Sequence, residues 1–154
     1  MNRRLLLVTS ATLLTSLALS DAHAQNVGKQ VISSPNAPEA IGPYSQAIKA
    51  GNTIYLSGQI AIDPKTKQLK TDTSIDDQTR LALENLKAVL AADGLTMDSI
   101  VSATVFLTDL MDFAKMNEVY ATYFKNSPPA RATVEVAHLP RNAKVEISAI
   151  AVHP

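Results

Sequence analysis

The spacing of the apolar residues constrains this fold more than any other sequence feature, because it switches between the two periods of regular secondary structure. Residues 53–60, TIYLSGQI, are apolar at every second position, which is the pattern of a half-buried strand. Residues 75–93 are apolar at every third or fourth position instead. That spacing predicts an amphipathic helix, capped by Ser74 or Asp76 and followed by Gly94 at its C-terminal end.

The same criteria divide the rest of the chain into short strands and one more helix. The predicted strands are residues 29–33, 45–50, 53–60, 100–107, 130–136 and 145–152, and the predicted helices are residues 75–93 and 112–124. The order β-β-β-α-β-α-β-β describes an α+β domain with a mixed sheet of about six strands. Two helices cover only one face of such a sheet, so the other face stays open.

The last two predicted strands indicate the character of that open face. Ala132 and Val134 alternate with Arg131 and Thr133, and the final strand alternates between apolar residues and the pair Glu146 and Ser148. We therefore expect one apolar face and one semi-polar face that carries Arg131. Because most side chains on the semi-polar face are neutral, we expect other subunits to cover it.

Residues 1–24 read as a signal for export. Arg3 and Arg4 precede an apolar run, and residues 22–24, AHA, have the small-x-small pattern of a cleavage site. A membrane anchor would need about 20 predominantly apolar residues, and this run is shorter. The arginine pair suits a Sec signal and a twin-arginine signal alike. We expect cleavage after residue 24, a single domain over residues 25–154, and export to the periplasm without a membrane anchor.

The composition of residues 25–154 excludes several classes of function. The full chain has 14 basic and 14 acidic residues, and loss of Arg3, Arg4 and Asp21 leaves 12 and 13. This balance predicts no binding to nucleic acid. Without cysteine the chain has no thiolate nucleophile or ligand, and only His138 and His153 remain as imidazoles. We therefore expect neither a metal nor a cofactor, in keeping with the absence of GxGxxG, GxxxxGK, GxSxG and HExxH motifs.

Arg131 is the residue that most suggests a site, because it begins an otherwise apolar strand in SPPARATVEV, residues 127–136. A guanidinium group cannot lose its charge in a protein and requires a partner when water is removed. One candidate partner is structural: Glu146, on a same-facing position of a strand that we expect to lie nearby. The other is the carboxylate of a substrate. The residues by themselves favour the structural ion pair and leave both open.

Four sequence blocks in order add a family resemblance. IGPYSQAI, YLSGQIA, PPARATVEVAHLP and KVEISAIAV resemble the RidA family, also called YjgF, of reactive intermediate deaminases, and the similarity runs from about residue 30 to the C-terminus. The resemblance implies a chorismate-mutase-like fold and a homotrimer with sites between subunits. It further implies the hydrolysis of imines and enamines of the 2-aminoacrylate type to 2-oxo acids and ammonia.

The resemblance also assigns roles to individual residues. It implies that Arg131 binds the substrate carboxylate and that Glu146 places the attacking water. It implies substrate contacts for five further residues, namely Tyr44, Ser57, Gly58, Asn117 and Thr133. Structural roles remain open for some of them: Tyr44 as packing under its proline loop, Gly58 as a strand kink, and Asn117 as part of a solvated helix face.

Two features depart from the pattern of the family. Thr133 stands where many deaminating members carry cysteine, and the N-terminal signal separates this chain from the cytoplasmic enzymes that generate imines. Three functions therefore stay open. The first is an exported imine deaminase, the second is a non-catalytic module that binds small carboxylates such as imino or oxo acids, and the third is a chaperone-like trimer that acts through its surface.

Overall fold

The structure, a computed structural model, describes residues 28–70 and 72–154; the predicted signal peptide lies outside the described residues. The strands are β1 (Lys29–Ile32), β2 (Ala47–Ala50), β3 (Thr53–Gln59), β4 (Ile100–Leu107), β5 (Ala130–Glu135) and β6 (Val145–Val152). The helices are α1 (Ile75–Ala91) and α2 (Phe113–Ala121), with short 3-10 turns at Met97–Ser99, Leu110–Asp112 and Pro140–Asn142. The predicted order of elements is confirmed, and every predicted end lies within three residues of the observed one.

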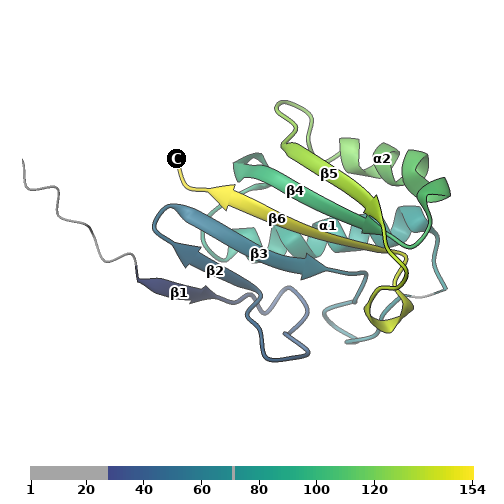
Figure 1. Cartoon of the computed structure of the whole chain (residues 1–154). Helices are drawn as coiled ribbons and strands as arrows, with labels where there is room; N and C mark the ends of the chain where they lie inside the picture. Colours follow the sequence, from purple (N-terminus) through teal and green to yellow (C-terminus); the bar gives the residue numbers. More distant parts are fainter. Residues whose placement is uncertain (1–27, 71) are drawn as a thin grey trace, which may run out of the picture.

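The six strands form one mixed sheet in the order β1-β2-β3-β6-β4-β5 (Figure 1). Neighbouring strands are antiparallel except β4 and β5, which run parallel because α2 forms the crossover between them. The predicted hairpin at Gly51 and Asn52 joins β2 to β3, and Gly51 has the positive φ of 60° that such a turn requires. The C-terminal strand β6 therefore lies in the middle of the sheet, between β3 and β4.

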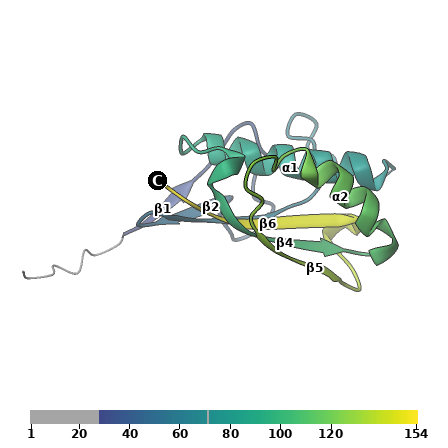
Figure 2. The same ribbon diagram turned by 90° about the horizontal axis from the view of Figure 1, so that it is seen from above.

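Both helices lie on the same face of the sheet (Figure 2). The helix α1 begins where expected, because the Ser74 hydroxyl accepts a hydrogen bond from the backbone of Asp77. Its buried stripe includes Leu83, Leu86 and Leu90, which belong to a core that also contains alternate residues of β4 and β6. This two-layer arrangement confirms the predicted α+β fold.

The strand β5 corrects one expectation. Arg131 is paired with Ala103 of β4, so its side chain lies on the helix-covered face, and Ala132 and Val134 lie on the open face. Glu146 is paired with Phe106 of β4 and lies on the open face. The predicted sharing of a face by Arg131 and Glu146 is therefore wrong. The cause is the register of β5, which pairs Arg131 with the core residue Ala103 of β4 on the face that the helices cover.

The open face of the sheet is largely neutral and partly apolar. Tyr55 is 50% exposed and Val134 is 43% exposed. A shallow hollow of about 170 Å³ lies on the sheet, lined in part by Tyr55, Ser102, Thr104 and Ser148. In the two described ranges, no helix combines the length and apolar character needed to cross a bilayer.

Candidate active site

A bulge in β3 brings Gly58 and Glu146 together. The register between β3 and β6 shifts between Leu56 and Gln59, so Ser57 and Gly58 fall outside the regular ladder. A Cβ atom on Gly58 would lie 2.7 Å from Cδ of Glu146 and closer still to its Oε1 atom. Only glycine leaves room for this carboxyl group, which explains why the strand carries glycine here.

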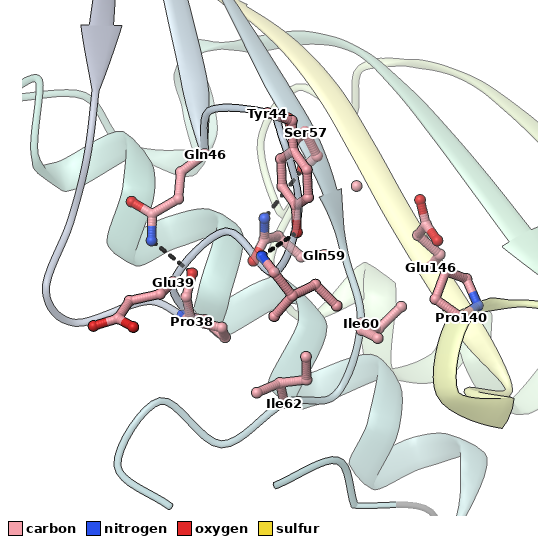
Figure 3. A pocket seen from close by; sticks show the side chains of 12 residues that line it. Pro38, Glu39, Tyr44, Gln46, Ser57, Gln59, Ile60, Ile62, Pro140 and Glu146 are labelled. Carbon is pink, nitrogen blue, oxygen red and sulfur yellow. Dashed lines mark hydrogen bonds between the residues drawn. The ribbon is translucent and has the colours of Figure 1, made fainter. Parts of the chain in front are cut away.

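The carboxyl group of Glu146 borders a cavity of about 380 Å³. Figure 3 shows Glu146 on one side of this cavity and Tyr44 on the other, with Ile60 and Ile62 toward the lower part of the view. We call it the Glu146 cavity. Its lining residues are Pro38, Glu39, Ile41, Tyr44, Gln46, Ser57, Gly58, Gln59, Ile60, Ile62, Pro140 and Glu146.

Gln46 fixes the proline-rich segment that forms one wall of the Glu146 cavity. Its amide oxygen accepts a hydrogen bond from the Ser34 backbone at 2.6 Å, and its amide nitrogen donates to the carbonyl oxygen of Pro38 at 2.7 Å. Gln46 is only 5% exposed, so these bonds satisfy backbone groups that water does not reach. Tyr44 extends the wall, and its hydroxyl group accepts a hydrogen bond from the backbone of Ile41 at 3.2 Å.

Asn85, which lies on the helix-covered side of the sheet, fixes the part of the Glu146 cavity that Ile60 and Ile62 line. It is a buried residue of α1, and its side-chain amide donates to the carbonyl oxygens of Ile60 at 3.2 Å and Ile62 at 2.9 Å. Ile60 and Ile62 form a small hydrophobic cluster with Ala143, separate from the main core. The cavity therefore has walls that are held by buried hydrogen bonds on both sides.

The environment of Glu146 alters its acid strength. Burial raises the pKa of this carboxyl group, because the charged form loses hydration. Within residues 28–70 and 72–154, its oxygen atoms have no hydrogen-bond or ion-pair partner. A half-buried carboxyl group without a partner is able to exchange a proton with a bound molecule.

Arg131 lies in a second hollow, on the other side of the sheet. Its guanidinium group lies 4.4 Å from the centroid of the Tyr120 ring and 5.9 Å from that of Phe113. Asn117, Pro129 and Arg131 are among the residues that line this hollow of about 460 Å³. No salt bridge to Arg131 occurs in the described part of the chain. No carboxylate of the described part of the chain therefore neutralises its charge, which leaves it able to attract an anion.

The predicted site residues thus fall into two groups in one chain. Tyr44, Ser57 and Gly58 lie with Glu146 at the Glu146 cavity. Asn117 lines the hollow of Arg131. Thr133 follows Arg131 on the same face of β5, and its hydroxyl oxygen is buried without a hydrogen-bond partner. The hypothesis of an ion pair between Arg131 and Glu146 is wrong, because the two residues lie on opposite faces with β4 between their strands.

Sequence reasoning did not identify several residues of these hollows. The sequence predicts no site role for Tyr120, although the Arg131 guanidinium group lies over its ring. Ile62 and Pro140 come from turns far apart in the sequence, and no local pattern links them. Among the described residues, no group of three or more His, Cys, Asp or Glu is placed to hold a metal ion.

Comparison with known proteins agrees with this architecture. A family model described as "Endoribonuclease L-PSP" matches residues 34–153. A RutC family protein of Pyrococcus horikoshii is 56% identical over 123 residues, which cover 80% of this chain and 97% of that protein. The 2-iminobutanoate/2-iminopropanoate deaminase of Mus musculus is 48% identical over 124 residues, which cover 80% and 91%.

A solved structure shows the same fold. The crystal structure of Escherichia coli TdcF with bound serine has a TM-score of 0.78 and 44% sequence identity, and the match covers 81% of this chain and 99% of that one. The chain therefore belongs to the endoribonuclease L-PSP family, and its resemblance to the RidA proteins is confirmed.

Proposed function

We propose that this protein is an enzyme that hydrolyses reactive imino acids, and their enamine tautomers, to 2-oxo acids and ammonia. The observation that carries the proposal is Glu146, a half-buried carboxyl group that has no partner and borders a largely apolar cavity next to Gly58. Relatives that are 46–48% identical to this chain are named imine deaminases, which supports the same reaction class.

Hydrolysis of an imine needs proton transfer more than it needs a strong nucleophile. In our proposal, water adds to the carbon of the protonated C=N bond and loses one proton to the ionised Glu146, which gives a neutral carbinolamine. Glu146 then returns this proton to the nitrogen, and the C–N bond breaks to release ammonia. The hydroxyl group loses its proton to solvent, so that the carbon keeps the oxygen as a ketone.

Arg131 is proposed to bind the carboxylate of the substrate, since a guanidinium fork matches the two carboxylate oxygens. Arg131 and Glu146 face opposite sides of one sheet, so one chain does not offer both to one molecule. We therefore propose that the Arg131 hollow of one subunit meets the Glu146 cavity of the next in a homotrimer. The neutral, partly apolar open face around Tyr55 supports such an assembly.

The remaining substrate contacts in the proposal are Tyr44, Ser57 and Gly58 on the Glu146 side and Asn117 and Thr133 on the Arg131 side. The family model is described as an endoribonuclease, which would act on RNA. A nucleic-acid substrate fits the Glu146 cavity less well than an imino acid does. The lining includes the two carboxyl groups of Glu39 and Glu146 and no lysine or arginine. Phosphodiester groups are bound by basic residues and repelled by carboxylates.

We also propose that residues 1–24 direct export to the periplasm and are removed, so that residues 25–154 form the working domain. The basic start, apolar run and AHA site support this proposal. Mass spectrometry of protein recovered from the periplasmic fraction tests it. A mass that begins at Gln25 is expected, and an intact N-terminus in the cytoplasmic fraction contradicts it.

The activity is tested by generating a 2-imino acid with an amino-acid oxidase and trapping it competitively with semicarbazide. The purified protein should lower the yield of semicarbazone and raise that of 2-oxo acid. Arg131→Ala should lower kcat/KM by about 10- to 100-fold, because it removes a charge-assisted hydrogen-bond pair. Arg80→Ala, on the exposed surface of α1, should match the wild type.

One result would reject the proposal as stated. Unchanged imine decay in the presence of the wild type removes the enzymatic function. If 2-oxo acids nevertheless stabilise the protein against heat, the protein is a carboxylate-binding module instead.

A further inference from the structure

We propose that Gln78 and Asn85, two buried amides of α1, are positioning residues that hold the Glu146 carboxyl group in its place beside Gly58. This inference rests on the proposed function, because it concerns the place of the base in that reaction. Neither amide is among the residues that line the Glu146 cavity, so each acts through the backbone that it binds.

The position of the two amides in the helix is the first observation. Gln78 and Asn85 stand at positions i and i+7 of α1, so they lie two turns apart on one side of the helix. Their exposed fractions are 0% and 1%, and the same buried stripe contains the apolar residues Ile75, Ala82 and Val89. A buried amide lowers stability unless its hydrogen bonds are made, so the partners of each amide indicate what it is there to hold.

Asn85 holds the chain shortly after Gly58. Its side-chain amide donates to the carbonyl oxygens of Ile60 at 3.2 Å and Ile62 at 2.9 Å. The bulge in β3 leaves Gly58 outside the regular ladder between β3 and β6, so that ladder does not fix its position. The bonds from Asn85 supply a constraint that begins two residues further along the chain.

Gln78 holds the chain shortly before Glu146. Its Oε1 atom accepts a hydrogen bond from the backbone of Lys144 at 2.9 Å, and its amide nitrogen donates to the carbonyl oxygen of Lys70 at 3.0 Å. The strand β6 is paired with β4 at Glu146, but its ladder with β3 begins only at Ile147. The bond from Gln78 therefore fixes the start of β6 where the pairing with β3 has not yet begun.

The helix α1 thus connects two segments that are far apart in the sequence, and it packs against both β3 and β6 (Figure 1). It keeps the two amides about 10 Å apart along its axis. One amide binds the backbone two residues after Gly58, and the other binds it two residues before Glu146. Because the Glu146 carboxyl group fills the space that a Cβ atom on Gly58 would need, a shift of either segment moves this group. A misplacement of roughly 1 Å costs a reaction roughly 100-fold in rate.

Replacement of the amides tests the inference through the rate. Gln78→Met and Asn85→Leu keep the approximate size of each side chain and remove its hydrogen bonds. Each should lower kcat for imine hydrolysis by at least about tenfold and change KM by less than about twofold, because the base moves while the substrate is still bound. An unchanged kcat in both variants overturns the inference.

Two milder variants of Gln78 keep the test valid if Gln78→Met does not fold. Gln78→Glu retains an oxygen that accepts the hydrogen bond from Lys144, so it should recover most of the lost kcat. Gln78→Asn shortens the side chain by one methylene group, so its kcat should lie below that of the wild type. A kcat for Gln78→Glu as low as that of Gln78→Met contradicts a role through the Lys144 bond.

A matched control separates positioning from stability. Val89 lies in the same stripe of α1, is 1% exposed and belongs to the main core. Val89→Ala should lower the melting temperature, as the amide variants do, because it leaves a cavity in the core. Its kcat, measured well below the melting temperature, should equal that of the wild type. An equal loss of kcat in Val89→Ala reduces the amides to a structural role and overturns the inference.

Coupling to Glu146 gives a further readout. In a Glu146→Gln background the base is already absent, so Gln78→Met should lower the remaining rate by less than about twofold. A loss as large as in the wild-type background contradicts an action through Glu146.

Titration of the Glu146 carboxyl group separates this inference from the proposed function, because it needs no turnover. Carbon-13 NMR of protein labelled in glutamate follows the carboxyl group, and Glu146→Gln identifies its signal. Burial raises the pKa of Glu146, and displacement toward water should return this pKa toward its ordinary value in Gln78→Met but not in Val89→Ala. That change in a protein that hydrolyses no imine supports the positioning role and rejects the enzymatic function. Imine hydrolysis with the same titration in Gln78→Met and the wild type rejects the positioning role and leaves the enzymatic function intact.

Discussion

At the scale of single residues, the buried carboxyl group of Glu146 lowers the stability of the folded protein but serves as a base in the proposed reaction. Its carboxyl group is half-buried beside Gly58 and has no partner in the described part of the chain, and burial raises its pKa. A folded-state pKa above the unfolded value means that the folded protein binds this proton more tightly. The ionised form therefore reduces stability, in return for a carboxylate that is a better base.

We predict that Glu146→Gln stabilises the protein at pH 7 and lowers kcat by at least about 100-fold, the usual contribution of a general base. The gain in the free energy of unfolding should shrink as pH falls through the raised pKa and vanish below the ordinary value of 4.5. Urea unfolding at several pH values measures it. Glu118→Gln, on the exposed surface of α2, is the control, and equal effects of the two variants would contradict the prediction.

Gly58 offers a second test at this scale. Gly58→Ala should lower kcat/KM by about tenfold or more, because the new methyl group displaces the Glu146 carboxyl group by occupying its place. The melting temperature should change little, since the displaced atoms are at the end of a flexible side chain. Gly28→Ala, where a Cβ meets nothing within 4 Å, is the matched control. In a Glu146→Gln background the Gly58→Ala effect on rate should largely disappear.

At the scale of elements, the proline-rich segment before β2 depends on a single side chain. We predict that Gln46→Ala lowers the free energy of unfolding by about 1–3 kcal/mol, because the buried backbone groups at Ser34 and Pro38 lose their partners. It should also raise KM more than it lowers kcat, since one wall of the Glu146 cavity loosens. Gln30→Ala, on the exposed strand β1, should stay within about 0.5 kcal/mol of the wild type. Equal destabilisation by both changes would show that the segment does not depend on Gln46.

The sequence was sufficient to predict the element order, the hairpin at Gly51 and the stripe of α1, because all three are local patterns. It was not sufficient to place β5. Alternation shows which residues of a strand share a face, but not which face of the sheet they join or which strand lies beside them. Arg131 and Glu146 were assigned to one face on that basis, but the register pairs Arg131 with Ala103 on the helix-covered face and Glu146 with Phe106 on the open face.

In the candidate site, too, the sequence predicted the residues that belong to local motifs and missed those that only tertiary contacts bring together. Short motifs indicated Tyr44, Gly58 and Glu146, which the fold brings to one cavity. The residues that give this cavity its size and apolar character, such as Ile62 and Pro140, were not indicated. Ile62 and Pro140 come from separate turns of the chain, and only tertiary folding brings these turns together.

At the scale of the whole molecule, the opposite orientation of Arg131 and Glu146 makes a specific assembly prediction. Arg131→Ala and Glu146→Gln should each have little activity as pure homotrimers. After the two variants are unfolded together and refolded in equal amounts, about a quarter of the sites should combine an intact Arg131 with an intact Glu146 from different subunits. The semicarbazide assay should then recover about a quarter of wild-type activity.

Light scattering complements this experiment by measuring the mass of the assembly. A trimer is expected for the wild type, and Thr104→Arg, which places a charge in the open-face hollow, should dissociate it. Ala91→Arg on the exposed end of α1 is the matched control and should remain a trimer. Failure of the mixed variants to recover activity while both remain trimers would contradict sites shared between subunits.

The place of β6 in the sheet has a consequence for how the protein is made. Among the six strands of the sheet, β6 is synthesised last, and it joins β3 to β4 in the middle of the sheet. Until β6 has been synthesised, no strand pairs β1 to β3 with β4 and β5, so the nascent chain has no complete sheet on which to fold. A premature stop codon anywhere before residue 145 removes the strand that unites the two halves of the sheet.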